Sequence, residues 1–369
     1  MRDFETITHL PRAMPFIIIS LRKNKAMHVS KNNDTSLKIL TIGGGSGQFV
    51  LLSSLRNMDG ISITAVVSMM DSGGSTGRLR DELGILPPGD ILKCIVALSP
   101  HQDFARRILQ KRFTKDRRLL GHNAGNMLLT ILSRYTGSFP SGVVALCEIL
   151  DAKGIILPVT TDQATLVAEL TDGRRIFGEE AIDIPRGHQR EKIRDVFLVP
   201  HHSDAIHVYP PVVEAIAHAD YILIGPGDLF TSVIPNLVVP GVAETLRNTK
   251  AKLIYIMNIM TKYGETHNFT AVDFVENLEM YLGRAVDCVI YNRMPPSDAI
   301  CRIYAEQKSE CVRLNPDDPF WKSRILHTGD LLETDGTVLR HDSEKLAALL
   351  QNILETEKLA KLQMIPLQP

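Results

Sequence analysis

A run of glycines stands between two apolar stretches near the start of this chain, and this order constrains the fold more than any other feature. The apolar stretch 37–42 (LKILTI) leads into the first loop, 43–48 (GGGSGQ), and residues 49–58 then place leucines at helical spacing. A second apolar stretch, 61–70, follows directly. Strand, glycine loop, helix and strand within about 30 residues form a β-α-β unit, which predicts a parallel sheet covered by helices.

The rest of the chain keeps this alternation and adds two insertions. Residues 90–150 have a helical pattern, and residues 155–200 change to short alternating runs with a hairpin signal at Asp172-Gly173. Strands and helices alternate again over residues 212–291. We therefore predict an α/β fold with a Rossmann-like, doubly wound, mostly parallel sheet, which carries a helical insertion at about 90–150 and a β-hairpin insertion at about 155–200.

Three parts are expected along the chain. Residues 1–36 end in a polar leader that cannot pack, so we expect a disordered N-terminal extension. Residues 37–300 are expected to form the α/β domain. Residues 301–369 should complete the same domain with a short β segment and a closing helix at 344–362.

Composition excludes several classes of protein. The chain has 41 Lys+Arg against 42 Asp+Glu, so its net charge of -1 gives no footprint for nucleic acid. Its five cysteines include no C-x-x-C pair, which argues against disulfides or a zinc knuckle and favours a reducing cytosol. No stretch approaches the ~18 apolar residues of a membrane span, and Asp3 and Glu5 interrupt the basic start that an export signal requires. We expect a cytoplasmic protein.

Two loops that follow the first two predicted strands suit a phosphate. In the first loop, Gly43 and Gly45 fit the dinucleotide fingerprint G-x-G-x-x-G, but Gln48 stands where the third glycine belongs. The second loop, 71–78 (DSGGSTGR), begins with Asp71 at the carboxyl end of its strand. Ligands of open α/β sheets bind at these strand ends, so Asp71 should meet a ribose hydroxyl or a metal there. A tight turn is the alternative interpretation of the first loop, and a capped turn leading into a helix is that of the second.

A third loop, 225–232 (GPGDLFTS), follows the predicted strand 221–224. Its glycines and hydroxyls suit a phosphate, but the carboxylate of Asp228 would repel one unless a cation lies between them. We therefore hypothesise that a divalent ion such as Mg²⁺ is held near Asp71 and Asp228. Asn123 and Asn126 open a predicted helix within GHNAGN, where they would either contact the ligand or only cap the helix.

Taken together, these segments resemble one family. The segments that carry the resemblance are GGGSGQ, MDSGGSTGRLRDELGILPPGDILKCIVALS, RF followed by LGHNAGNMLL, GPGDLFTSVIPNL and NIMTKYGETHNFTAVD. They look like the gluconeogenesis-factor (YvcK-like) branch of the 2-phospho-L-lactate transferase (CofD) superfamily, in the same order over about residues 38–300. Residues 301–369 match less clearly.

The resemblance implies a nucleotide-binding domain and two alternative functions. One is a cytoplasmic UDP-sugar-binding factor needed for cell shape and for growth on gluconeogenic carbon sources. The other is a magnesium-dependent transferase that moves a phospholactyl group from a nucleotide diphosphate-activated donor. The implied nucleotide contacts are Gly44, Gly45, Ser46, Gly47, Asp71, Ser72, Gly73, Asn123, Asn126, Gly225, Gly227 and Thr231. No catalytic residue is assigned.

The chain departs from the family pattern at several positions. Asp228 and Phe230 stand where the family usually has Ser and Tyr, and Lys262-Tyr263 replaces the usual Gln-Pro. Phe269 removes a tyrosine hydroxyl that bears on sugar recognition, so nucleotide binding is a firmer expectation than the sugar. A nicotinamide-dependent oxidoreductase is a third alternative, which explains the first loop but not the other two.

The resemblance and the pattern of residues 124–150 also give expectations for partners. A regulator of this kind would act on a protein partner in cell-wall or carbon metabolism. The long apolar helices between 124 and 150 offer a face for a homodimer.

Overall fold

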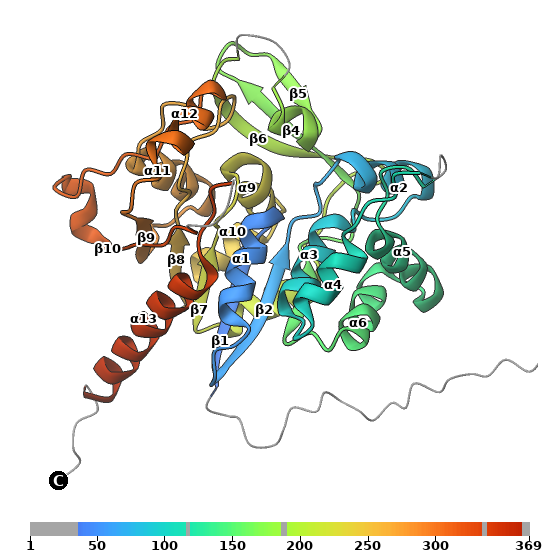
Figure 1. Ribbon diagram of the computed structural model, residues 1–369, viewed down its shortest axis with the longest axis horizontal. Coiled ribbons are helices and arrows are strands. Elements are labelled where there is room, and N and C mark those ends of the chain that lie inside the picture. The colour runs from blue at the N-terminus through green and yellow to red at the C-terminus, as the bar shows by residue number, and fades with distance from the viewer. Residues whose placement is uncertain (1–35, 116–118, 186–189, 334–337, 364–369) are drawn as a thin grey trace, which may run out of the picture. The chain divides into compact units, whose positions relative to one another are not determined.

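A seven-stranded sheet forms the centre of the computed structural model, which describes residues 36–115, 119–185, 190–333 and 338–363 (Figure 1). The order is β10-β9-β8-β7-β1-β2-β3, and all neighbouring strands are parallel. The strands are β1 Leu37–Gly43, β2 Ile61–Val67, β3 Ile155–Pro158, β7 Tyr221–Ile224, β8 Lys252–Ile256, β9 Cys288–Asn292 and β10 Ile325–Gly329. Except for Ser36, the N-terminal extension expected at 1–36 lies outside the described residues.

Helices cover this sheet, as the apolar strands require. All of β7 and most of β1 are buried, which is typical of parallel strands covered on both faces. Helix α1 packs against both α3 and α13, and α8, α9, α10 and α11 form a second group. These helices are α1 Gly45–Leu55, α3 Gly89–Leu98, α8 Pro210–His218, α9 Ile234–Leu237, α10 Val242–Asn248, α11 Ala271–Leu282 and α13 Ser343–Gln363.

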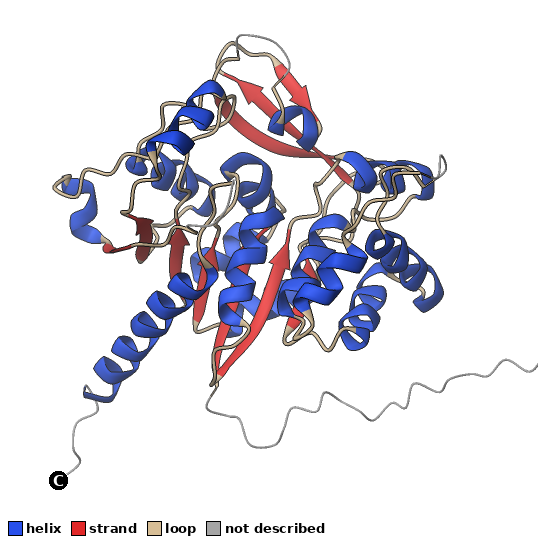
Figure 2. Ribbon diagram, in the orientation of Figure 1, coloured by secondary structure: helices blue, strands red, loops and turns tan. Residues whose placement is uncertain are grey.

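Two additions interrupt the alternation of strands and helices, as predicted (Figure 2). The first is helical and comprises α4 Gln102–Leu109, α5 Ala124–Thr136 and α6 Phe139–Ile149. The second is a smaller antiparallel sheet of order β5-β4-β6, formed by β4 Ala164–Leu170, β5 Arg175–Phe177 and β6 Ile193–Pro200. Glu169 pairs with Arg175 across the predicted Asp172-Gly173 turn. The α/β fold class with both insertions is therefore confirmed.

The region predicted as a short β segment at 301–340 is mixed. Strand β10 lies there and pairs with β9, but α12 Asp298–Glu306 occupies its start. A 3₁₀ turn, Pro319–Ser323, precedes β10. The closing helix expected at 344–362 is α13.

No single helix in the described part of the chain is both long and apolar enough to cross a membrane. One pair of short helical segments, 229–237 and 242–248, meets the length and composition requirements only when taken together, with a bend of 74° between them.

The order of the strands reverses beside β1. The chain passes from β1 to β2 and β3 on one side, and returns at β7 on the other side to continue to β8, β9 and β10. Ile42 near the end of β1 pairs with Ile224 at the end of β7, so the loops that follow these strands start side by side. Open α/β sheets bind ligands at such a reversal, outside the carboxyl ends of the strands.

Candidate functional site

The first and third loops pack directly on each other at this reversal. A β-carbon placed on Gly47 would lie 2.1 Å from the carbonyl oxygen of Pro226, and one on Gly227 would lie 3.6 Å from that of Gly44. Asn236 joins the two loops from α9, because its Nδ2 donates to the carbonyl oxygens of Gly43 (3.2 Å) and Ser232 (2.9 Å). Side chains larger than hydrogen at Gly47 would therefore force the loops apart.

A cavity of about 410 Å³ opens between these loops, and we call it the switch-point pocket. Ser46 and Gly47 line it from the start of α1, where the first backbone N–H groups lack partners within the helix. Gly227 and Asp228 line it from the third loop, and Lys262 from the segment after β8. The start of a helix attracts negative charge, so this pocket suits a phosphate group.

The second loop lines a different cavity of about 390 Å³, the polar pocket. Asp71 folds back on its own loop, because its Oδ1 accepts a hydrogen bond from Gly73 N at 2.9 Å. Helix α2 Gly74–Leu83 starts here, and Ser75 Oγ lies 2.9 Å from His122 Nδ1. The guanidinium of Arg112 lies within 3.6 Å of a β-carbon placed on Gly74.

Asn123 and Asn126 bring the start of α5 into the polar pocket. Asn123 is the N-cap of α5, and its Oδ1 accepts a hydrogen bond from Asn126 N at 2.7 Å. The Nδ2 of Asn126 donates to Ser75 Oγ at 3.4 Å, and its Oδ1 is buried without a hydrogen-bond partner. Asn123 thus serves as a cap, and both side chains also line the pocket.

The start of α3 lies between the first and second loops. A β-carbon on Gly44 would lie 2.9 Å from Asp90 Oδ2, and one on Gly89 would lie 2.8 Å from Asp71 Oδ2. Lys93 Nζ donates to Asp90 Oδ1 at 2.9 Å and so offsets part of the negative charge. Residues of all three predicted loops and of the α5 start therefore border two neighbouring pockets on the same edge of the sheet.

Helix α7 Glu179–Asp183, which follows β5 of the smaller sheet, covers the second loop. The backbone N–H of Ser72 donates to Glu179 Oε2 at 3.3 Å, and Ser72 Oγ accepts from Glu180 N at 3.0 Å. The Glu179 carboxyl group thus accepts a hydrogen bond from a backbone N–H of the loop that we predicted would bind a phosphate. We had not predicted α7, because five residues are too few to show a helical period.

Burial and mutual repulsion raise the pKa values of the acidic groups in the polar pocket. Burial, followed by the charge of Asp90, raises the pKa of Asp71 to about 6. Burial, followed by the charges of Asp71 and Asp183, raises the pKa of Glu179 to about 8. The pocket therefore gains negative charge as the pH rises through neutrality.

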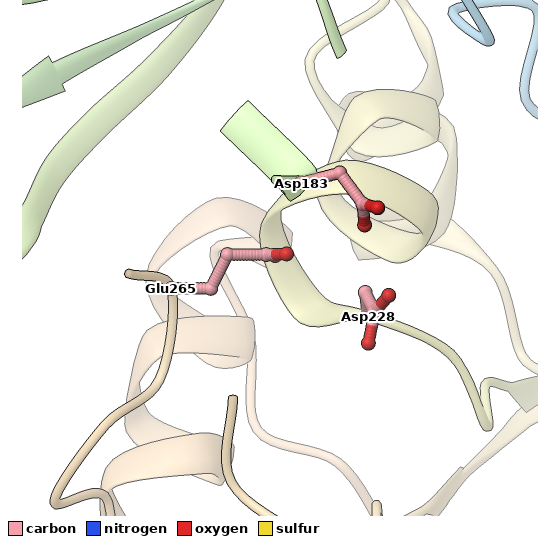
Figure 3. Close-up of side chains that lie close together, drawn as sticks. All are labelled: Asp183, Asp228 and Glu265. Atoms are coloured by element: carbon pink, nitrogen blue, oxygen red, sulfur yellow. The ribbon is translucent and has the colours of Figure 1, made fainter. Parts of the chain in front are cut away.

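A second acidic cluster stands beside the switch-point pocket. Figure 3 shows the carboxyl groups of Asp183, Asp228 and Glu265 directed toward one another, and their oxygens lie within 4.8 Å. Lys262 Nζ lies 2.7 Å from Asp228 Oδ2 and 3.1 Å from Glu265 Oε1, and it also contacts Asp183. Burial raises the pKa of Glu265 to about 8, while Lys262 opposes the shift. The hypothesis of a metal between Asp71 and Asp228 did not foresee this arrangement, in which Asp228 is grouped with Asp183 and Glu265.

Seven of the sequence-predicted residues line the two pockets. Ser46, Gly47 and Gly227 line the switch-point pocket, and Asp71, Gly73, Asn123 and Asn126 line the polar pocket. Gly44, Gly45, Ser72 and Gly225 belong to the same loops but are not among the lining residues. Thr231 is buried and donates to both carboxylate oxygens of Glu265 at 3.3 Å, so its hydroxyl faces the acidic cluster. Asp90, Lys93, Glu179, Asp183 and Glu265 were missed, because their sequence surroundings resemble ordinary helix starts and surface turns.

The fold and these loops define a Rossmann-like α/β protein with an anion-accepting crevice at the strand reversal. Residues 39–327 match the family model described as "2-phospho-L-lactate transferase CofD". The chain belongs to this family.

Relatives with known names place the chain more closely within the family. It is 37% identical over 319 residues to the "Gluconeogenesis factor" of Bacillus subtilis, an alignment that covers 86% of this chain and 98% of that protein. It is 38% identical over 315 residues to the protein of the same name from Halalkalibacterium halodurans, which covers 84% and 94%. A crystal structure of a Bacillus halodurans protein superposes with a TM-score of 0.80 at 35% identity, and covers 86% of this chain and 99% of that one.

Proposed function

We propose that this protein binds a nucleotide sugar, with UDP-sugars as the preferred class, at the carboxyl edge of its central sheet. The observation that carries the proposal is the direct contact of the first and third loops beside a cavity of about 410 Å³, which is lined by the start of α1, where the first backbone N–H groups have no partners within the helix. The polar pocket next to it offers amides at Asn123 and Asn126, which suit the hydroxyl groups of a sugar.

The proposed role is that of a cytoplasmic factor required for growth on gluconeogenic carbon sources and for cell shape. The names of the relatives support the first part of this role. The resemblance described above supports the second. Binding alone suffices for such a role, since a ligand shifts an equilibrium between two states when it binds them with different affinities. The signal would pass to a protein partner in cell-wall or carbon metabolism.

A homodimer is part of the same proposal. Ile131, Tyr135 and Val144 on α5 and α6 are 49%, 88% and 56% exposed, which is unusual for large apolar side chains that lie on adjacent helices. Sedimentation equilibrium of the full chain tests this part, and a concentration-independent monomer mass would contradict it.

The alternative function is the transfer of a phosphorus-containing group from a nucleotide diphosphate-activated donor. The match to a model named for 2-phospho-L-lactate transferase favours it. Such chemistry relies on positioning and charge neutralisation, for which this family implies Mg²⁺. Asp71 presents one carboxylate for a metal. The group around Asp228 does not fit one, because Lys262 already contacts its oxygen.

Titration calorimetry separates these functions. The full chain is titrated with UDP-glucose, GDP and NAD, each with Mg²⁺ and with EDTA. Saturable binding of UDP-glucose is the expected result. Tight binding of GDP only with Mg²⁺ would favour the transferase, and saturable tight binding of NAD alone would overturn the proposal.

A substitution in the first loop tests where the ligand binds. Ser46→Asp introduces a carboxylate at the start of α1 within the switch-point pocket, and we expect UDP-glucose affinity to fall at least about tenfold. Ser141→Asp, on the exposed face of α6, is the matched control and should bind as the wild type does. Equal affinities for the two variants would place the ligand elsewhere.

A further inference from the structure

Lys262 is the centre of the acidic cluster beside the switch-point pocket. The three carboxyl groups come from separate parts of the chain: Asp183 ends α7, Asp228 lies in the third loop, and Glu265 follows β8. Within the described residues these three form a group whose oxygens lie close enough together to hold one metal ion (Figure 3). The ammonium group of Lys262 contacts all three.

The contacts of Lys262 are those of an ion held in place. Its Nζ lies 2.7 Å from Asp228 Oδ2 and 3.1 Å from Glu265 Oε1, and it also contacts Asp183 Oδ1, so one ammonium group bridges all three carboxyl groups. The lysine side chain is only 29% exposed and that of Glu265 only 1%. Burial lowers the pKa of Lys262, but the three carboxyl groups outweigh it and raise the pKa, so the ammonium keeps its charge.

The lysine also answers the problem that Asp228 poses for an anionic ligand. Asp228 and Lys262 both line the switch-point pocket, next to Ser46 and Gly47 at the start of α1. Asp228 alone would repel a bound phosphate, but the ammonium group of Lys262, 2.7 Å from its Oδ2, offsets part of that charge. An ammonium on a tether does this without a metal that has to be taken up from solution.

We propose that Lys262 is a tethered cation, which takes the position between Asp183, Asp228 and Glu265 that a divalent ion would otherwise occupy. The cluster of the wild-type protein therefore excludes divalent metal ions. On the proposed function, it further follows that nucleotide-sugar binding at the switch-point pocket is independent of a metal at this cluster.

Removal of the ammonium group should convert the cluster into a metal site. Mn²⁺ binding to the full chain, without nucleotide, is measured by electron paramagnetic resonance of the free ion. Lys262→Gln should bind one more Mn²⁺ per chain than the wild type, at least about tenfold more tightly than any binding by the wild type, and Lys262→Gln/Asp228→Asn should lose it. Lys262→Arg keeps a cation and should resemble the wild type.

A matched control removes a lysine from a different ion pair. Lys252→Gln breaks the contact with Glu357 at the opposite end of β8, and it should leave Mn²⁺ binding unchanged. Thermal unfolding followed by circular dichroism checks that every variant is folded. If Lys262→Gln does not fold, Mn²⁺ titrations of the wild type and of Asp228→Asn decide. A wild-type Mn²⁺ site that is lost in Asp228→Asn would overturn the proposal, and the absence of such a site would support it.

Two results for the folded variants would contradict the proposal. In the first, Lys262→Gln binds no more Mn²⁺ than the wild type. In the second, the wild type has an Mn²⁺ site that the Asp228→Asn substitution removes. A separate titration with UDP-glucose addresses the ligand. Wild-type affinity should be equal in Mg²⁺ and in EDTA, whereas Lys262→Gln should lose about tenfold in EDTA and regain affinity with Mn²⁺. A wild-type protein that binds no UDP-glucose would refute the proposed function and leave the Mn²⁺ result intact.

Discussion

Gly47 is the residue on which the contact between the first and third loops depends. A β-carbon at this position would lie 2.1 Å from Pro226 O and 2.6 Å from Pro226 C, which is inside any permitted contact. We expect Gly47→Ala to lower the free energy of unfolding by about 1–3 kcal/mol, as overpacking does, and to weaken UDP-glucose binding.

Gly43→Ala is the matched control for this prediction. The atoms nearest to its β-carbon would be those of Gln48, at 3.6 Å or more, so stability should change by less than about 1 kcal/mol. Urea unfolding and calorimetry measure both variants. Equal losses in the two would show that the loop contact does not control stability.

Glu179 should make ligand binding depend on pH. Its pKa of about 8 and that of Asp71 near 6 mean that both carboxyl groups ionise as the pH rises from about 6 to 8. UDP-glucose keeps its charge over this range, so its affinity should fall several-fold from about pH 6 to 8 by repulsion. Glu179→Gln, which retains the oxygen that accepts from Ser72 N, should flatten this profile.

The raised pKa of Glu179 also makes the free energy of unfolding depend on pH. In the folded protein the pKa of Glu179 is raised to about 8, whereas the ordinary pKa of this group is 4.5. Between these values the folded state binds the extra proton, so the free energy of unfolding falls as the pH rises. Urea unfolding should show a smaller fall for Glu179→Gln. Glu180→Gln, an exposed neighbour on α7, should keep the wild-type slope.

The sequence predicts residues well where the chemistry is local and poorly where charges meet. The glycines of the three loops stand out because two or more of them fall within each short loop that follows a predicted strand. Asp183 and Glu265 carry no such mark, since their neighbourhood is formed by segments that are distant along the chain. Lys262 was noticed as a departure from the family pattern, but its contacts with three carboxyl groups needed coordinates.

At the scale of elements, the start of helix α5 allows helix capping and ligand binding by Asn123 to be tested separately. Asn123 accepts from Asn126 N as the N-cap and also lines the polar pocket. Asn123→Ala should lower the free energy of unfolding by about 1 kcal/mol, whereas Asn123→Ser should restore most of it, because serine caps helices about as well.

Both Asn123 variants remove the side-chain amide, so both should weaken UDP-glucose binding by a similar factor. Urea unfolding and calorimetry on the same preparations separate the two effects. Wild-type affinity in Asn123→Ser would mean that Asn123 only caps α5.

Elements were predicted accurately where their ends carry signals. Helix α11, Ala271–Leu282, lies in the stretch 212–291 where alternating strands and helices are expected. Thr270 and Asp273 form a capping box at its start, and Gly283 ends it in the left-handed region. Helix α12 was not expected, although its amphipathic sequence and its N-cap, Ser297, were available signals. In the structure it buries no residue.

At the scale of the whole molecule, the α/β class and the doubly wound order were accessible from the sequence, and the relation between the two pockets was not. The apolar strands alone predict a parallel sheet, and the three loops at strand ends predict backbone N–H groups gathered along one edge of that sheet. The insertion of the α3 start between the first two loops, and of α7 over the second, follows from packing across the chain.

Hydrogen–deuterium exchange of the full chain with saturating UDP-glucose tests most directly whether these loops hold one ligand. Slower exchange is expected in three separate segments at once, 43–48, 71–78 and 225–232, because backbone N–H groups there would bond to the ligand. Saturated binding that slows exchange only elsewhere, and leaves all three segments unchanged, would contradict the account.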